Sequence, residues 1–144
     1  MSSGDLFIRM LSFQEWAPYA EAAHAVAFQE MRKPTMERLD FVFVAEKNGA
    51  PAAYVTCREF DAESLYFSRG GAFPITKGSV RSFHAFLGFV GKSRELGYKR
   101  ITYLVHNKNK AMLKFTLAAD FLAIGCRTID GETYIEFLKT LEEN

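Results

Sequence analysis

The hydrophobic pattern of the chain changes its period at Ser79, and this change constrains the fold more than any other feature of the sequence. The apolar residues that follow recur at intervals of three and four: Val80, Phe83, Leu87 and Val90. This spacing predicts a helix over 79–96, and Gly97 stands where a helix end favours a left-handed residue. The next run, RITYLVH (100–106), predicts a strand. A long helix between two strands implies that the strands are parallel neighbours joined by a right-handed crossover.

Before that helix, three short runs of β-branched and aromatic residues predict three strands, over 41–46, 52–60 and 64–73. Asn48-Gly49 separates the first two runs, and this dipeptide is the strongest short-range signal for a β-hairpin. A few polar residues join the second run to the third. The pattern therefore predicts an antiparallel meander of three strands.

The first forty residues predict one strand and two helices. Residues 6–11 are short and mostly apolar, as in an opening strand. Ser12 and Glu15 have the spacing of a capping box, which predicts a helix from Ser12 to about Met31. Pro34 suits the first turn of a second, short helix that runs to Leu39.

The C-terminal part predicts a helix over 109–119 and a final hairpin of strands 121–129 and 132–140 around Asp130-Gly131. The complete order is strand, two helices, three strands, helix, strand, helix and two strands. This order indicates an α/β fold with a mixed, mostly antiparallel sheet. Because no repeat or linker divides the chain, we expect residues 1–144 to form a single domain.

Length, charge and cysteine content narrow the function classes. The 144 residues carry 18 Lys and Arg against 17 Asp and Glu, so no strong electrostatic field favours nucleic acid or a membrane surface. Cys57 and Cys126 stand far apart without a His cluster, which argues against a metal site or a disulfide. The sequence shows no membrane-spanning run and no targeting segment at its start. We therefore expect a cytoplasmic protein.

The segment RELGYKRITYLVHNKNKAMLKFTLAADFLAIG (94–125) resembles the GCN5-related N-acetyltransferase (GNAT) superfamily. Members often show a helix that ends in glycine, a strand, an asparagine and then a helix that closes on Gly-Phe. Gly97, Asn109 and Phe121 stand at the corresponding places, while Asp120 replaces the second glycine. The resemblance implies a sheet whose fourth and fifth strands are parallel and splayed, helices on both faces, and acetyl-CoA as co-substrate.

In this family, a glycine-rich loop at the start of a helix binds the pyrophosphate of acetyl-CoA. Backbone N–H groups at a helix N-terminus suit a phosphate, and glycine allows its close approach. The residues to which the resemblance assigns cofactor binding lie around this loop and around the later Asn: Ala72, Phe73, Ile75, Lys77, Gly78, Ser79, Val80, Arg81, Asn109 and Met112. Gly78 fits the first glycine of the family pattern, whereas Val80 stands at the second. The alternative is an ordinary turn with Ser79 as a helix cap.

Three residues are candidates for catalysis. Thr116 stands where many family enzymes carry a tyrosine that protonates the departing thiolate, although a threonine hydroxyl is far less acidic than a phenol. Glu63 begins the third meander strand and is a family-like candidate for the general base. His106 ends the parallel strand, at the edge where ligands of α/β sheets bind. The alternatives are an ordinary helix residue for Thr116 and solvated side chains for the other two.

Two functions follow from these observations. The first is an N-acetyltransferase that transfers an acetyl group from acetyl-CoA to a small-molecule or peptide amine by direct attack. The second is a catalytically inactive binding or structural module, because the changes at Thr116, Val80 and Asp120 resemble those in small virion proteins of some tailed phages that have this fold. Partners on nucleic acid or membranes are not expected, and either function is compatible with a monomer or a homodimer.

Overall fold

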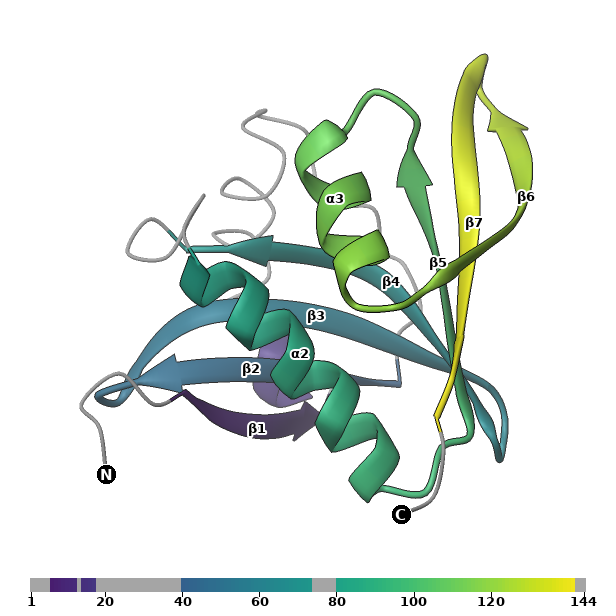
Figure 1. Ribbon diagram of the computed structural model, residues 1–144. Helices are drawn as coiled ribbons and strands as arrows, with labels where there is room; N and C mark the ends of the chain where they lie inside the picture. The colour runs from purple at the N-terminus through teal and green to yellow at the C-terminus, as the bar shows by residue number, and fades with distance from the viewer. Residues whose placement is uncertain (1–5, 13, 18–39, 74–79, 142–144) are drawn as a thin grey trace. The chain divides into compact units, whose positions relative to one another are not determined.

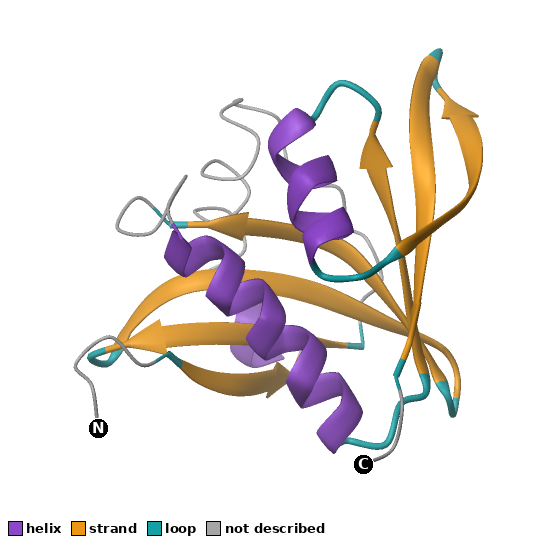
Figure 2. Cartoon of the chain, in the orientation of Figure 1, coloured by secondary structure: helices purple, strands orange, loops and turns teal. Residues whose placement is uncertain are grey.

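The computed structural model describes residues 6–12, 14–17, 40–73 and 80–141 (Figures 1 and 2). Residues 14–17 are helical. The other elements, in chain order, are β1 (Phe7–Ser12), β2 (Phe41–Lys47), β3 (Ala50–Asp61), β4 (Ser64–Ala72), α2 (Val80–Glu95), β5 (Arg100–His106), α3 (Lys110–Ala118), β6 (Leu122–Ile129) and β7 (Glu132–Thr140). Each predicted element within the described residues is confirmed, with ends that differ by one or two residues.

The strands follow the order β1-β2-β3-β4-β5-β7-β6 in the sheet. Pairing is antiparallel for β1–β2, β2–β3, β5–β7 and β6–β7, and it is parallel for β4–β5. The mixed, mostly antiparallel sheet is therefore confirmed. The crossover through α2 makes the parallel neighbour, as the change of hydrophobic period predicts.

Both predicted hairpin turns have the expected backbone. Asn48 and Gly49 take φ of 54° and 79°, and Asp130 and Gly131 take φ of 50° and 78°. Two successive positive φ values define the turn whose twist matches that of the flanking strands, and Asn, Asp and Gly adopt them at the lowest cost. These two dipeptides therefore set the register of β2 with β3 and of β6 with β7.

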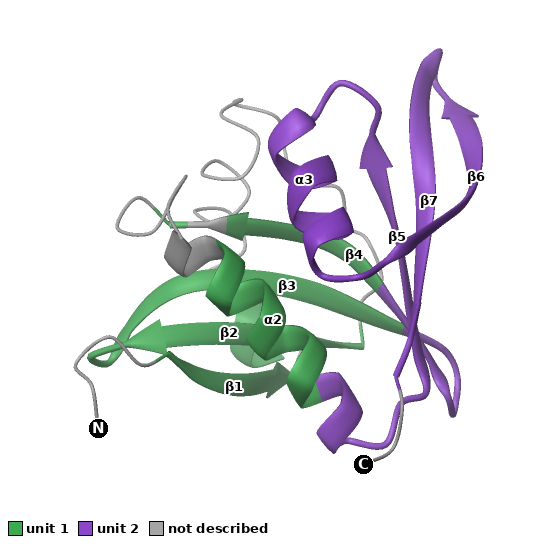
Figure 3. Cartoon of the chain, in the orientation of Figure 1, with its two compact units in different colours: residues 1–58, 67–92 green, residues 59–66, 93–144 purple. Residues whose placement is uncertain are grey.

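Two compact units share the chain (Figure 3). Unit 1 consists of residues 1–58 and 67–92, and unit 2 consists of residues 59–66 and 93–144. Three elements, β3, β4 and α2, run from one unit into the other. The expectation of a single domain over 1–144 stays a prediction.

In unit 1, the two faces of the sheet bury aromatic residues against different partners. On one face, Phe43 stacks on Phe89 of α2 with ring centroids 6.2 Å apart, where α2 crosses the strands (Figure 1). On the other face, Trp16 lies 5.0 Å from the ring of Tyr54 and packs with Val42. Since successive strand residues point to opposite faces, helical segments cover both faces of this part of the sheet.

The predicted capping box is present at the first helical turn. The Ser12 amide donates to the Glu15 carboxylate at 3.0 Å, and the Glu15 amide donates to the Ser12 hydroxyl at 3.2 Å. The Ser12 bonds hold the pKa of Glu15 below its ordinary value. The rest of the predicted helix to Met31, and the short helix 34–39, lie outside the described residues.

In unit 2, α3 ends in a hydrogen-bonded loop that positions Phe121. The amide of Asp120 donates to the carbonyl of Leu117, and the amide of Phe121 donates to the carbonyl of Thr116. This pair of bonds is a Schellman motif, and it requires a left-handed residue at Asp120, whose φ is 65°. Asp120 thus adopts the conformation for which the family pattern has glycine.

We expect Asp120→Gly to raise the free energy of unfolding by about 1 kcal/mol, because glycine takes the left-handed region without the steric cost of a Cβ atom. Asp120→Ala should lower it, since aspartate adopts the left-handed region more readily than alanine. Urea denaturation of the three proteins measures both changes. A loss of stability in Asp120→Gly would contradict the role of this position.

Candidate functional site

The parallel pairing of β4 with β5 covers the first three residues of each strand. The register places Ser64 opposite Arg100, Leu65 opposite Ile101 and Tyr66 opposite Thr102. Leu65 and Ile101 are fully buried, so this short ladder has an apolar centre. The two strands then continue to Ala72 and to His106.

Thr102 occupies the last paired position and carries an unusual hydroxyl. Its Oγ1 atom is buried and has no hydrogen-bond partner among the described residues. The residues on either side of it in the sheet are Tyr66 of β4 and Leu138 of β7, and the Tyr66 ring stacks on Phe60. A buried polar group without a partner costs about 1–3 kcal/mol and needs an explanation. A polar group of a bound molecule would supply the missing partner only after the side chains that cover the Oγ1 atom move aside.

Sequence reasoning missed Thr102, because a threonine in an apolar strand looks like any other β-branched strand residue. Only the register, which places Thr102 where the parallel ladder ends, distinguishes it.

Glu63 is held at the start of β5. Its carbonyl accepts hydrogen bonds from the amides of Lys99 and Arg100 at 2.8 and 3.1 Å. Its carboxylate lies 3.1 Å from the Lys99 ammonium. Its amide donates to Asp61 Oδ1 at 2.8 Å, and this bond holds the pKa of Asp61 below its ordinary value. Glu63 therefore contributes several bonds to the junction between the β3–β4 turn and β5.

His106 lies at the other end of the same strand. It is the sixth residue after Arg100, which corresponds to roughly 20 Å along an extended strand. Since Glu63 bonds to Arg100, this predicted general base and His106 lie at opposite ends of β5. One reacting nitrogen cannot contact both, so the structure does not bring these candidates together.

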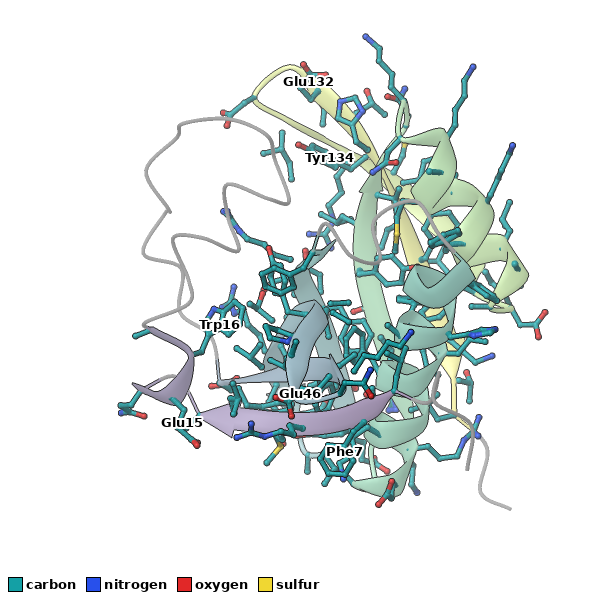
Figure 4. The ribbon with its side chains drawn as sticks, turned by 90° about the vertical axis from the view of Figure 1, so that its left-hand side faces the viewer. Phe7, Glu15, Trp16, Glu46, Glu132 and Tyr134 are labelled. Atoms are coloured by element: carbon teal, nitrogen blue, oxygen red, sulfur yellow. The ribbon has the colours of Figure 1, made fainter. Side chains whose placement is uncertain are left out.

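Both ring nitrogens of His106 have partners. Nδ1 accepts the amide of Lys108 at 3.1 Å, and Nε2 lies 2.8 Å from Glu132 Oε2. Because Nδ1 accepts, a neutral ring carries its proton on Nε2 and donates it to Glu132. This bond and the charge of a protonated ring lower the pKa of Glu132. The Tyr134 ring packs edge-on at 5.2 Å, so the imidazole is fixed in orientation. Figure 4 shows Tyr134 and Glu132 toward the same end of the molecule.

Thr116 is fully buried and its hydroxyl pairs with the hydroxyl of Tyr103. Tyr103 comes from β5, and its ring lies 5.0 Å from the ring of Phe121. Burial raises the pKa of Tyr103, so the phenol keeps its proton. This placement favours a structural role for Thr116, and its role as a proton donor stays a prediction.

Comparison with solved structures decides the fold. The ribosomal-protein-S18-alanine N-acetyltransferase of Escherichia coli superimposes with a TM-score of 0.77 at 15% identity, over 97% of this chain and 96% of that chain. A GNAT family acetyltransferase from Elizabethkingia anophelis with acetyl-CoA bound gives 0.76 at 13% identity, over 94% and 98%. The acetyltransferase of GNAT family from Streptococcus pneumoniae gives 0.74 at 11% identity, over 96% and 100%.

The chain has the GNAT fold. No protein-family model matches it, and no curated protein matches it in sequence. At this level of identity, the likeness shows the fold and leaves the reaction to be proposed. No helix in the described part of the chain is long and apolar enough to cross a membrane.

The predicted cofactor residues of this GNAT fold are described only in part. Asn109 caps α3, where its Oδ1 accepts the amide of Met112 at 3.2 Å. The amide of Phe73 donates to the carbonyl of Ala52 at 2.9 Å. Four of the remaining residues lie outside the described residues: Ile75, Lys77, Gly78 and Ser79. For three others the backbone is described and the side chain is not: Ala72, Val80 and Arg81. Their contacts with acetyl-CoA stay predictions.

We expect Thr116→Val to lower the free energy of unfolding by about 1–3 kcal/mol, because it leaves the buried Tyr103 hydroxyl without its partner. Adding Tyr103→Phe to this variant should recover part of the loss, since two apolar groups of similar shape replace the pair. Urea denaturation of the four proteins in this double-mutant cycle measures the coupling. Additive losses would show that the two hydroxyls do not interact.

The contacts of His106 predict its tautomer. In the neutral ring, the proton should lie on Nε2 in most molecules, because Nδ1 accepts the Lys108 amide. Nitrogen-15 NMR of the labelled ring distinguishes the two tautomers, and Glu132→Gln is a matched control in which only the acceptor of the Nε2 proton changes. A ring with its proton on Nδ1 would contradict the observed geometry.

Proposed function

We propose that this chain is an N-acetyltransferase that uses acetyl-CoA and an amine acceptor. The observation that carries the proposal is the GNAT fold over at least 94% of the chain, including the parallel β4–β5 pair, together with the acetyl-CoA bound by a structural neighbour at a TM-score of 0.76. We propose a small-molecule or peptide amine as acceptor. The cysteines of the described residues, buried Cys57 and exposed Cys126, are free thiols, which supports a reducing cytoplasm as the compartment.

The proposed reaction is a direct acyl transfer. The neutral amine nitrogen forms a bond to the acetyl carbonyl carbon, and the bond from that carbon to sulfur breaks. The nitrogen loses one proton, and the departing sulfur ends as a thiol. Acetyl-CoA supplies the activated acetyl group, and the protein supplies orientation, exclusion of water and proton transfer.

The described residues fit an extended polar ligand beside the end of the β4–β5 ladder. The Thr102 hydroxyl is buried without a partner there, and an amide or carbonyl of the ligand would satisfy it once the side chains that cover it move aside. The ordered start of α3, which Asn109 caps, lies after the same end of β5 as His106. These features support a site at the carboxyl end of β5, where ligands bind in open α/β sheets.

Of the catalytic candidates Glu63 and His106, His106 has the better position to act as the general base in this reaction. It lies at the carboxyl end of β5, whereas Glu63 lies at the opposite end and is paired with Lys99. A neutral His106 has one lone pair, on Nδ1, and the Lys108 amide occupies it. His106 can therefore accept a proton from an amine only after this local bond opens.

A second candidate function is a GNAT-like binding module without catalysis. The observation that favours it is the buried pair of Thr116 with Tyr103, because many family enzymes carry an acidic tyrosine at the position of Thr116. Such a module would bind a ligand or partner and release no coenzyme A thiol.

Acetyl-CoA should raise the thermal unfolding midpoint of the protein. Binding to the folded state stabilises it by about 2.7 kcal/mol when free ligand is in hundredfold excess over the dissociation constant. Thr102→Val should unfold at the same or a higher temperature without ligand, because it removes an unpartnered hydroxyl, and should show a smaller shift with acetyl-CoA. Differential scanning fluorimetry with both proteins tests this.

A matched variant and an activity assay distinguish loss of the Thr102 hydroxyl from other effects, and an enzyme from a binding module. Thr102→Ser keeps the hydroxyl and should keep the shift. Release of free thiol in the presence of a panel of amines then distinguishes an enzyme from a binding module. No shift in the unaltered protein with millimolar acetyl-CoA would reject both the enzyme and an acetyl-CoA-binding module.

A further inference from the structure

Strand β6 is the last strand of the sheet and is exposed along its whole length. All eight residues from Leu122 to Ile129 are exposed, including three large apolar side chains: Leu122, Ile124 and Ile129 at 69%, 51% and 44%. One edge of β6 pairs with β7, and no other strand follows it in the described sheet. An edge strand presents a row of backbone donors and acceptors that can pair with another strand.

The features that protect edge strands are sparse in β6. Monomeric proteins blunt an edge with Lys, Pro, uncompensated charges or a very short strand. β6 has neither Lys nor Pro, and its one charged residue, Arg127, is neutralised by Glu136 at 3.1 Å. A bulge between Ala123 and Gly125 disturbs the start of the strand. The ladder from Gly125 to Ile129 is regular and open to pairing.

Symmetry limits how β6 can pair with a second copy of itself. In an antiparallel ladder, successive residue pairs alternate between hydrogen-bonded and non-hydrogen-bonded. A two-fold axis relates the pair of residue i in the first copy and residue j in the second to the pair of residue j in the first copy and residue i in the second. These two pairs must be of the same type. Because neighbouring pairs differ in type, one residue must lie opposite its own copy. If that residue were Arg127, like charges would be opposed, and if it were Gly125, the bulges would flank the axis. With Thr128 at the axis, Arg127 would lie opposite Ile129 of the other copy and would gain no charged partner.

Cys126 at the axis keeps the like charges apart and makes the two charges complementary, with a regular ladder from Gly125 to Arg127 of each strand. With Cys126 opposite its copy, Arg127 of each strand lies opposite Gly125 of the other. A Cβ atom at Gly125 would have Glu136 Oε1 at 4.0 Å as its nearest neighbour, so the space above this glycine is open and bordered by a carboxylate oxygen. Glu136 Oε2 binds its own Arg127. The other oxygen is therefore directed to where the second Arg127 would lie.

We propose that the chain forms a two-fold homodimer through antiparallel pairing of β6 with β6 of a second copy, with Cys126 at the axis. Each Glu136 carboxylate lies between two guanidinium groups, one from each copy. The two carboxylates and two guanidiniums form a neutral cluster on one face of the continuous sheet. On the other face, the two Cys126 side chains are directly opposite. The proposal does not depend on the enzymatic function.

Charge reversal tests this arrangement in solution. R127E and E136R, each alone, should be monomeric by sedimentation velocity at concentrations where the unaltered protein has twice the monomer mass, because like charges then meet across the axis. A mixture of R127E with E136R should regain the doubled mass, since opposite charges then meet in both halves of the interface. The pair is partly exposed within one copy, so each variant should stay folded, with an unfolding temperature lower only by the stabilisation that the dimer adds.

Oxidation gives a second readout at the axis. Directly opposed residues in an antiparallel pair have Cα atoms about 4.5–5.5 Å apart, within the range that a disulfide spans. Mild oxidation of the whole protein should therefore give a covalent dimer on a non-reducing gel, and Cys126→Ser should give none, because Cys57 is buried.

Gly125→Val is a matched control for the open space. It should leave the monomer folded, because a Cβ atom there meets nothing closer than 4.0 Å, and should weaken the dimer about tenfold or more by excluding the second Arg127. A monomeric unaltered protein would overturn the proposal. A dimer that persists in R127E, or a mixture of single variants that stays monomeric, would overturn the assigned register.

Discussion

The backbone carbonyl of Glu63 accepts hydrogen bonds from the amides of both Lys99 and Arg100. The strand registers within unit 2 depend on these two bonds. They join the end of the β3–β4 turn to the first residue of β5 and so start the parallel ladder with Ser64 opposite Arg100. The hydroxyl of Tyr98 strengthens the junction by donating to Glu59 at 2.9 Å. Because β7 pairs with β5 from Arg100 to His106, and β6 pairs with β7, each later register follows from this start.

The sequence predicted most of the described fold because the signals were local and strong. The two hairpin dipeptides, the helix period after Ser79 and the glycine at Gly97, whose φ is 97°, each act within a few residues. Asp120 shows the limit of such signals. Its left-handed φ comes from the Schellman bonds at the end of α3, and the packing of Phe121 supports these bonds. An aspartate in the sequence does not by itself predict a left-handed residue.

The candidate site was harder to predict, because strand register decides which of its residues lie close together. A parallel β4–β5 pair already implies that Glu63, before β4, and His106, at the end of β5, lie at opposite edges, so this separation could have been inferred from the predicted topology. The hydrogen-bond partners of His106 could not have been inferred in this way. The turn after β5 brings the Lys108 amide to the ring, and the β6–β7 hairpin brings Glu132 to it. The unpartnered hydroxyl of Thr102 depends on packing on both sides of β5.

The Tyr103–Thr116 pair bears on how a GNAT fold could work without a tyrosine on the helix. Burial raises the pKa of the phenol, and Thr116 engages it, so neither hydroxyl is poised to give up a proton. A thiol of ordinary pKa, about 8.5, leaves readily as a thiolate near neutral pH, and solvent can protonate it afterwards. General acid catalysis typically contributes about 10²–10⁴ in rate, so the proposed acyl transfer would be slower without the tyrosine but not impossible.

The face of β7 that carries Glu132 and Glu136 connects the candidate site with the proposed dimer. The two carboxylates are four residues apart and therefore point to the same side of the sheet. Glu132 fixes the imidazole of His106, and Glu136 binds Arg127. A strand added at β6 would hold Arg127, and through it Glu136 and the middle of β7, in one position. Since β7 pairs with β5 along its length, Tyr134 opposite His106 included, dimer formation would also restrict the strand end at which we place the reaction.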